Sequence, residues 1–263
     1  MCQECGCGSG GGDVKIGPPP HQHDHHHGPG HPEHGHAHTP AHGILTLNLN
    51  RSLMEKNALA AERNRRLFRA KKLLVLNVVS SPGSGKTTFI RETAASLTGK
   101  LRVGVIVGDL ATDNDAARLR TAGIPVVQIT TGTVCHLDAD MVAKAASQLN
   151  LDQLDVLVIE NVGNLVCPAD YDLGEDLRVV LLSTTEGEDK PLKYPPMFHS
   201  AHVAVITKCD MAAAAGFNRD WALANLNRVS HHAKIFELSA KIGDGMKGWL
   251  DFLGERAATT QHK

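Results

Sequence analysis

This sequence lacks the features that mark secreted, membrane-spanning and nucleic-acid-binding proteins. Its formal net charge is −1, so neither a basic surface for nucleic acid nor a strongly acidic one appears overall. The longest apolar runs, such as residues 73–79, have the length of a strand and are far too short to span a membrane. The opening residues contain no apolar segment of the kind that a secretory signal needs. We therefore expect a cytoplasmic protein with no membrane span and no nucleic-acid partner.

Large apolar residues are also scarce in the first 43 residues, which consist mainly of Gly, Pro, His and Cys. Such a segment buries too little apolar surface to offset the entropy lost on ordering. Residues 1–43 are therefore predicted to form a disordered, metal-binding Cys/His-rich tail. Residues 44–72 contain neither Pro nor Gly and are rich in Ala, Leu, Arg and Lys. They predict an amphipathic basic helix that docks on the rest of the protein, in preference to one that binds nucleic acid or membrane.

Short apolar runs alternate with helical stretches from residue 73 to residue 263. The runs are continuous, as expected for strands that are buried on both faces of a sheet. This order is typical of an α/β fold in which about seven mostly parallel strands carry helices on both faces. The predicted strands are residues 73–79, 102–107, 124–129, 154–159, 179–183, 203–207 and 235–238.

A glycine-rich loop, Ser-Ser-Pro-Gly-Ser-Gly-Lys-Thr-Thr, runs from Ser80 to Thr88 directly after the first predicted strand. Its glycines permit the backbone to turn N–H groups towards an anion, and the following helix adds the positive end of its dipole. This context predicts the phosphate loop of a P-loop NTPase, although Ser80 stands where the general motif has Gly. The predicted nucleotide contacts here are Gly83, Ser84, Gly85, Lys86, Thr87 and Thr88, of which Lys86 and Thr87 are also catalytic.

Two later stretches, each directly after a predicted strand, bear on the base. They are Lys208-Cys209-Asp210 and Ser239-Ala240-Lys241, and they are similar to the Asn-Lys-x-Asp and Ser-Ala-Lys loops that read guanine, with Thr207 in place of Asn. A carboxylate can accept hydrogen bonds from N1–H and the 2-amino group of guanine, donors that adenine does not offer there. The sequence therefore predicts GTP and GDP as ligands, held by Lys208, Asp210, Ser239, Ala240 and Lys241.

Acidic residues follow two other predicted strands. Asp109 comes after residues 102–107 and is our first choice for a Mg²⁺ ligand beside Thr87, with Asp113 and Asp115 as alternatives that can instead cap the next helix. Glu160 comes after residues 154–159, where a carboxylate would approach the Mg²⁺ or the attacking water. We expect Lys86, Thr87, Asp109 and Glu160 to form the catalytic set.

Three groups of Cys and His residues predict sites for a transition metal. Cys2, Cys5 and Cys7 lie within six residues, and thiolates in such a cluster bind nickel or zinc. Ten of the sixteen histidines lie between His21 and His42 and indicate a buffering arm with weak, exchangeable sites. Cys135, His136 and Cys167 lie inside the predicted nucleotide-binding domain and provide an open site or half of a shared one.

Together these motifs resemble the HypB family, the hydrogenase nickel-incorporation GTPases, which are SIMIBI-class P-loop GTPases of the HypB/UreG group. The resemblance covers nearly the whole chain. It rests on the amino-terminal Cys motif, the loop from Ser80 to Thr88, residues 132–138, the segment from Glu160 to Pro168, and Glu186-Gly187-Glu188-Asp189-Lys190-Pro191.

The resemblance implies a GTP-hydrolysing metallochaperone that binds nickel and drives its insertion into the large-subunit precursor of a [NiFe]-hydrogenase. It also implies a homodimer that forms more readily with GTP, a HypA-like nickel metallochaperone as partner, and a high-affinity nickel site at Cys2, Cys5 and Cys7. A second site for nickel or zinc is implied at Cys135, His136 and Cys167, near the dimer interface.

Three other functions fit parts of the sequence. A urease-type nickel GTPase shares the fold, but the Cys-Pro-His motif expected of it is missing. A nickel storage protein would carry a vestigial phosphate loop. A nucleotide kinase would need an Arg-rich lid, which is not evident.

Overall fold

The computed structural model describes residues 41–110 and 113–262, and side chains from Ser52 onward. The predicted tail ligands Cys2, Cys5 and Cys7, and the histidine tract up to residue 40, lie outside the described residues. Seven parallel strands form one sheet in the order β3-β2-β4-β1-β5-β6-β7, which confirms the predicted α/β fold. The strands are β1 (Leu74–Val79), β2 (Val103–Asp109), β3 (Val126–Thr130), β4 (Val156–Glu160), β5 (Leu177–Ser183), β6 (Val203–Thr207) and β7 (Lys234–Glu237).

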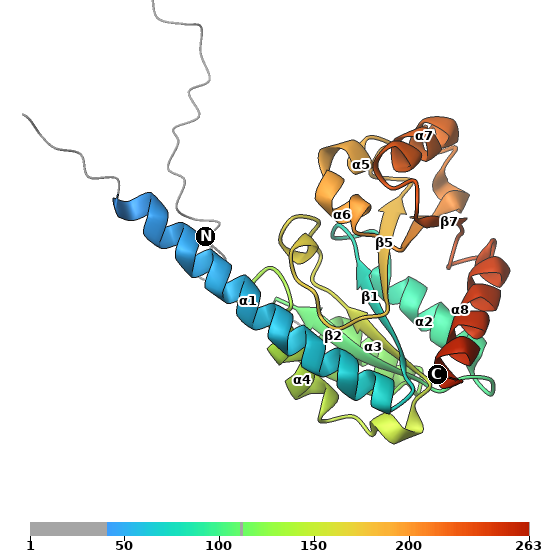
Figure 1. Ribbon diagram of the computed structural model, residues 1–263. Coiled ribbons are helices and arrows are strands. Elements are labelled where there is room, and N and C mark those ends of the chain that lie inside the picture. Colours follow the sequence, from blue (N-terminus) through green and yellow to red (C-terminus); the bar gives the residue numbers. More distant parts are fainter. Residues whose placement is uncertain (1–40, 111–112, 263) are drawn as a thin grey trace, which may run out of the picture.

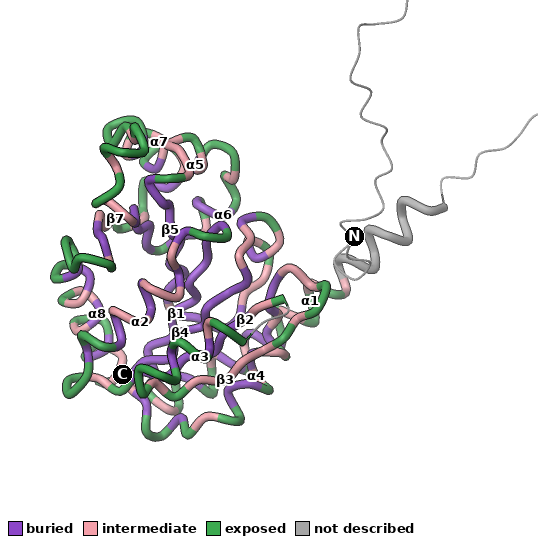
Figure 2. Tube along the Cα trace, turned by 180° about the vertical axis from the view of Figure 1, so that it is seen from behind, coloured by how far each residue is buried: buried purple, intermediate pink, exposed green. Residues whose placement is uncertain are grey.

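Burial falls from the centre of the sheet to its edges (Figure 2). Strands β1, β4, β5 and β6 are buried along their whole length. The edge strands β3 and β7 are only partly covered, so our expectation that every run is buried on both faces was wrong for these two. An edge strand has a neighbour on one side only, and fewer helices reach over it.

Helices cover both faces of the sheet because alternate side chains of each strand point to opposite sides. In β1, Leu74, Leu76 and Val78 pack into one core with α2, α3 and α8, whereas Val75 packs into a second core with α1 and α4. Figure 1 shows α1 and α4 side by side, on the same face of the sheet. The helices are α1 (Ala41–Ala70), α2 (Lys86–Leu97), α3 (Asn114–Thr121), α4 (Ala139–Ala146), α5 (Lys190–Lys193), α6 (Pro195–His199), α7 (Arg219–Val229) and α8 (Met246–Gln261).

Strand order determines where a ligand can bind. The chain leaves β1 towards β2 on one side of the sheet, and the connection from β4 to β5 crosses to the other side of β1. In α/β sheets, ligands bind outside the carboxyl ends of the strands at such a switch point. The loops that follow β1, β2, β4, β5 and β6 therefore meet at one edge of the sheet.

Helix α1 packs on the domain along its second half. Ala60, Ala61 and Phe68 are buried, and Nδ2 of Asn64 donates hydrogen bonds to the carbonyl oxygens of Ala139 (2.8 Å) and Leu173 (3.1 Å). The helix begins at residue 41, whereas we had assigned residues 41–43 to the tail. Although α1 is long, no helix in the described part of the chain combines the length and apolar character of a membrane span.

Candidate nucleotide and metal sites

The phosphate loop has the backbone conformation that anion binding needs. Gly83 and Gly85 have φ angles of 75° and 96°, a region that residues with a side chain rarely adopt. Helix α2 begins directly after Gly85, so its unpaired N–H groups lie at the loop. Gly83, Gly85, Lys86, Thr87 and Thr88 line a cleft of about 450 Å³ at the carboxyl end of the sheet.

Ser80, which replaces the first glycine of the general motif, is buried inside this loop. Its hydroxyl oxygen accepts hydrogen bonds from the Ser84 hydroxyl and from Nζ of Lys86, the latter at 3.0 Å. Burial lowers the pKa of Lys86, and the nearby carboxylates of Glu160 and Asp115 oppose that effect. The serine therefore gives the lysine ammonium a neutral partner within the loop.

A second cleft of about 310 Å³ adjoins the first and shares Gly85 and Thr88 with it. Thr207, at the position where the guanine motif has Asn, donates from Oγ1 to the carbonyl oxygen of Ser84 at 3.1 Å. Nζ of Lys208 donates to the carbonyl oxygen of Gly83 at 2.7 Å, so both residues brace the phosphate loop. The lining includes Ser84 and all the residues predicted to read guanine, namely Lys208, Asp210, Ser239, Ala240 and Lys241.

Oxygen ligands gather at the junction of Thr87 and Glu160. The Thr87 hydroxyl donates to Oε1 of Glu160 at 2.8 Å, and Asp109 lines the same cleft. Asp115 also lines it, whereas Asp113 stands at the N-cap of α3 and does not. Hydroxyl and carboxylate oxygens are the ligands that hard cations such as Mg²⁺ prefer.

Glu160 is strongly perturbed by its position. Its side chain is only 2% exposed, and Oε2 has no hydrogen-bond partner among the described residues. Burial raises the pKa of Glu160 to about 7, against the opposing effects of the Lys86 charge and the Thr87 hydroxyl. A buried carboxyl with a free oxygen fits a nearby cation, because the cation would supply the missing partner.

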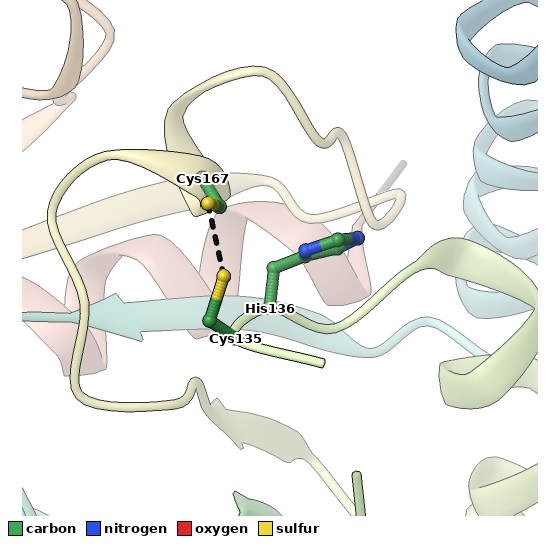
Figure 3. A group of neighbouring side chains, drawn as sticks. All are labelled: Cys135, His136 and Cys167. Atoms are coloured by element: carbon green, nitrogen blue, oxygen red, sulfur yellow. Dashed lines mark hydrogen bonds between the residues drawn. The ribbon is translucent and has the colours of Figure 1, made fainter. Parts of the chain in front are cut away.

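The second predicted site brings Cys135, His136 and Cys167 together from two loops (Figure 3). One ligand atom from each residue lies within 4.8 Å of the others, and the two sulfur atoms are 3.0 Å apart. Cys135 and His136 lie between β3 and α4, and Cys167 begins a short 3-10 helix, Cys167–Ala169, after β4. Two thiols and an imidazole form a soft donor set that suits nickel or zinc.

His136 is held in the form that binds a metal. The residue is 5% exposed, and its ring stacks on that of Tyr171 with 3.8 Å between the ring centroids. Burial lowers the pKa of His136, although the Asp138 carboxylate opposes this. Nδ1 is buried without a hydrogen-bond partner among the described residues, so a neutral ring leaves this nitrogen available to a metal.

The loops of the two sites touch at two glycines. A Cβ atom at Gly163, which lies between Glu160 and Cys167, would stand 3.1 Å from Cα of Pro82 in the phosphate loop. A Cβ atom at Gly108, next to Asp109, would stand 2.8 Å from the side chain of Leu137, which follows His136. The segments that carry the candidate metal ligands therefore pack against elements that line the nucleotide cleft.

Three polar or aromatic residues that our sequence analysis missed hold the metal loops. Oδ1 of Asn161 accepts from the backbone N–H of Leu137 (3.4 Å), and Nδ2 of Asn164 donates to the carbonyl oxygen of Cys135 (3.1 Å). Tyr171 supplies the ring beneath His136. The only signal for these residues was their place in or near the conspicuous segment 160–168, which does not reveal their partners.

Known proteins resemble this chain in both sequence and structure. Residues 74–237 match the family model described as the CobW/HypB/UreG nucleotide-binding domain. The chain is 50% identical over 207 residues to hydrogenase maturation factor HypB of Escherichia coli strain K12, an alignment that covers 79% of this chain and 71% of that protein.

Two solved structures share the fold. The crystal structure of HypB from Helicobacter pylori in complex with nickel has a TM-score of 0.75 and 40% sequence identity, covering 78% of this chain and 97% of that one. The crystal structure of HypB from Archaeoglobus fulgidus has a TM-score of 0.73 and 38% identity, covering 77% of this chain and 99% of that one.

Proposed function

The chain belongs to the HypB group of the CobW/HypB/UreG family, and on that basis we propose that it is a GTP-hydrolysing nickel metallochaperone. Its role in this proposal is to bind nickel and to drive its insertion into the large-subunit precursor of a [NiFe]-hydrogenase. Nickel is the cargo of the cycle, and GTP hydrolysis to GDP and phosphate gives the cycle its direction.

The nucleotide half of the proposal rests on the two adjoining clefts. The phosphate-loop N–H groups and Lys86 would hold the β- and γ-phosphates, and the second cleft would take the base. Asp210 would accept from N1–H and the 2-amino group of guanine. Thr87 and Asp109 would hold Mg²⁺, which when bound supplies charge neutralisation to the transferring phosphoryl group. Glu160 would orient the attacking water or help to hold the cation.

The metal half rests on the donor set of Cys135, His136 and Cys167. A site with three protein ligands keeps a position open, which suits a metal that must be received and passed on. The pair of thiols at 3.0 Å would ionise as the metal binds, since thiolates are the ligating form. Cys2, Cys5 and Cys7 are proposed as a separate tail site for nickel.

The single observation that carries the proposal is the loop that follows β4. This loop follows Glu160, the last residue of β4, whose carboxylate accepts from Thr87, and it reaches the proposed metal ligand Cys167 seven residues after Glu160. At Gly163 it packs against the phosphate loop. A change in the nucleotide cleft that moves Glu160 would therefore move a metal ligand, and we propose that the GTP and GDP states differ in nickel affinity for this reason.

Partners follow from the family. We propose that the chain forms a homodimer in its GTP state, with the site of Cys135, His136 and Cys167 near the interface. A HypA-like nickel metallochaperone is the proposed partner that passes nickel to the hydrogenase precursor. A urease-type nickel GTPase remains the alternative client assignment, and a nickel store with an idle phosphate loop is the alternative mechanism.

The test uses the full chain with Cys2, Cys5 and Cys7 changed to Ser, so that thiolate-to-nickel charge-transfer absorption contains no contribution from the tail thiols. Nickel would be titrated with GDP and with a non-hydrolysable GTP analogue, in this parent and in its Cys167→Ala variant. We expect two different affinities in the parent and loss of the band in the variant. Equal nickel affinities with both nucleotides would contradict the proposed coupling. If Lys86→Ala left GTP turnover unchanged, the proposed GTPase activity would be contradicted.

A further inference from the structure

A network of buried, hydrogen-bonded polar side chains crosses the sheet below the two sites. Asn77 interrupts the apolar run of the central strand β1 and is fully buried, as is Asn161 beside it. Glu175, which precedes β5, and Arg178, the second residue of β5, continue the network and are 8% and 6% exposed. Burying polar groups this deep costs free energy unless each of them is hydrogen-bonded. Their hydrogen-bond partners therefore show what the network holds in place.

Each hydrogen bond of this network can run in only one direction, from a fixed donor to a fixed acceptor. The Glu175 carboxylate can only accept, so Oε1 receives Nε of Arg178 and Nδ2 of Asn77, both at 3.1 Å. Asn77 must then present its oxygen to Asn161, which donates from Nδ2 at 3.2 Å. The oxygen of Asn161 is left to face the backbone N–H groups of Leu137 (3.4 Å) and Val162 (2.9 Å). The charge on Glu175 therefore fixes both amides.

One end of the network lies at the nucleotide cleft and at the loop that carries His136. Asn161 directly follows Glu160, whose carboxylate accepts a hydrogen bond from Thr87. Oδ1 of Asn161 accepts from the backbone N–H of Leu137, the residue after His136. The hydrogen bond from the backbone N–H of Leu137 to Oδ1 of Asn161 is the longest in this network, at 3.4 Å. A small shift of Glu160 would therefore break this bond first.

The other end lies under the loop of Cys167. Nη1 of Arg178 donates to the carbonyl oxygen of Ala169 (2.9 Å), and Nη2 donates to that of Tyr171 (2.8 Å). Ala169 ends the short helix that Cys167 begins, and Tyr171 stacks on His136. A planar guanidinium with several fixed donors holds this loop in one position, which a lysine ammonium would not do.

We propose that Asn77, Glu175 and Arg178 are positioning residues that transmit the state of the nucleotide cleft to the metal ligands. When Glu160 shifts, the amide of Asn161 turns, and the rigid row through Asn77 and Glu175 carries the change to Arg178 and the loop it holds. This inference rests on the proposed function and adds to it the residues that carry the coupling without touching nucleotide or metal.

A purely structural network would predict a different result. Removing it would then weaken the fold and both sites equally, as would removing any other buried hydrogen bond. Thr93 provides that comparison, because it is buried on α2 and accepts from Nε1 of Trp249 at 3.0 Å, on the opposite face of the sheet. The distinguishing quantity is the ratio of nickel affinities in the two nucleotide states, which general destabilisation leaves unchanged.

The experiment compares Asn77→Leu and Thr93→Val in the full chain that lacks the tail thiols. Leu has nearly the shape of Asn but no donor or acceptor. Nickel affinity would be read from the thiolate charge-transfer band with GDP and with a non-hydrolysable GTP analogue, against a competing chelator. Asn77→Ser is measured in parallel and takes the place of Asn77→Leu if circular dichroism shows that the leucine variant is unfolded.

We expect Asn77→Leu to bind nickel and both nucleotides but to bring the affinity ratio closer to one by about 2- to 30-fold. Thr93→Val should keep the ratio of the parent. An unchanged ratio in Asn77→Leu, or equal losses in both variants, would overturn the proposed relay while leaving the proposed function in place. A ratio of one in the parent itself would overturn the coupling and the relay together.

Discussion

At the scale of single residues, the proposed preference for guanine depends on Asp210. Asp210 lines that cleft beside Ser239 and Lys241. Asp210→Asn places an amide where guanine offers two donors, so GTP affinity should fall roughly 10- to 100-fold. The same amide complements xanthine, whose 2-oxo group accepts, so XTP should bind better than it does to the parent. Competition with a fluorescent nucleotide measures both, and unchanged GTP affinity would contradict the base assignment.

One histidine should make stability depend on pH. Nδ1 of His202 accepts from the backbone N–H of Arg178 at 2.9 Å, and burial lowers the pKa of His202 below its ordinary 6.5. Below about pH 6.5 the unfolded chain binds a proton at this ring that the folded chain does not, so the free energy of unfolding falls with decreasing pH.

His202→Asn tests this directly, because an amide oxygen can accept the same hydrogen bond but does not titrate. Between about pH 7.5 and about pH 5.5 the parent should lose more stability than the variant. Urea unfolding at both pH values measures the difference. The other histidines titrate in both proteins and cancel, so parallel losses would show that folding leaves the pKa of His202 unchanged.

At the scale of elements, the loop after β4 joins the two sites through close packing. Gly163→Ala would place a methyl group 3.1 Å from Pro82, and the two loops must separate by a few tenths of an ångström. We expect a loss of about 1–3 kcal/mol in the free energy of unfolding and weaker binding of both GTP and nickel. Gly254→Ala in α8, where nothing lies within 4 Å, is the matched control and should be neutral or stabilising. Weaker binding of only one ligand would argue against a shared loop.

Helix α1 depends on another close approach. Gly174 has φ +90°, and a Cβ atom there would stand 2.7 Å from the carbonyl oxygen of Ala61 and 2.8 Å from Cβ of Asn64. Gly174→Ala should therefore cost about 1–3 kcal/mol from strain, and more from the displacement of α1. Gly123→Ala, at φ +75° with open space, carries the strain alone. Equal losses in urea unfolding would show that α1 contributes nothing at this contact.

The elements could be predicted from the sequence where local rules are sufficient. A continuous apolar run such as residues 154–159 leads directly to the buried strand β4, and the loop from Ser80 to Thr88 contains its own phosphate-binding geometry. The relay could not be predicted, because Asn77 and Glu175 are 98 residues apart and each taken alone is an ordinary polar residue. Partial exposure of β3 and β7 also depends on strand order, which no local pattern contains.

At the scale of the whole molecule, helices outside the family domain pack on the same sheet. The family model covers residues 74–237, yet α1 and α8 on either side of it pack on opposite faces of the sheet. Asn64 of α1 binds the carbonyl oxygen of Leu173, whose backbone N–H donates to Oε2 of Glu175. The helix next to the Cys/His-rich segment is thus connected to the proposed relay beside the candidate metal ligands.

If the nucleotide cleft and the metal site are two parts of one equilibrium, their coupling must be reciprocal. The factor by which a GTP analogue changes nickel affinity, relative to GDP, must equal the factor by which nickel changes the preference for the analogue over GDP. Both can be measured in the full chain without tail thiols, one by charge-transfer absorption and the other by nucleotide competition at saturating nickel. We expect the two factors to agree within error, in a range of about 5- to 150-fold. In Cys167→Ala, which loses the charge-transfer band, nickel should leave the preference for the analogue over GDP unchanged. A large effect of nucleotide on nickel with none of nickel on nucleotide would mean that the two assays report different metal sites, and the coupling would then have to be assigned outside Cys135, His136 and Cys167.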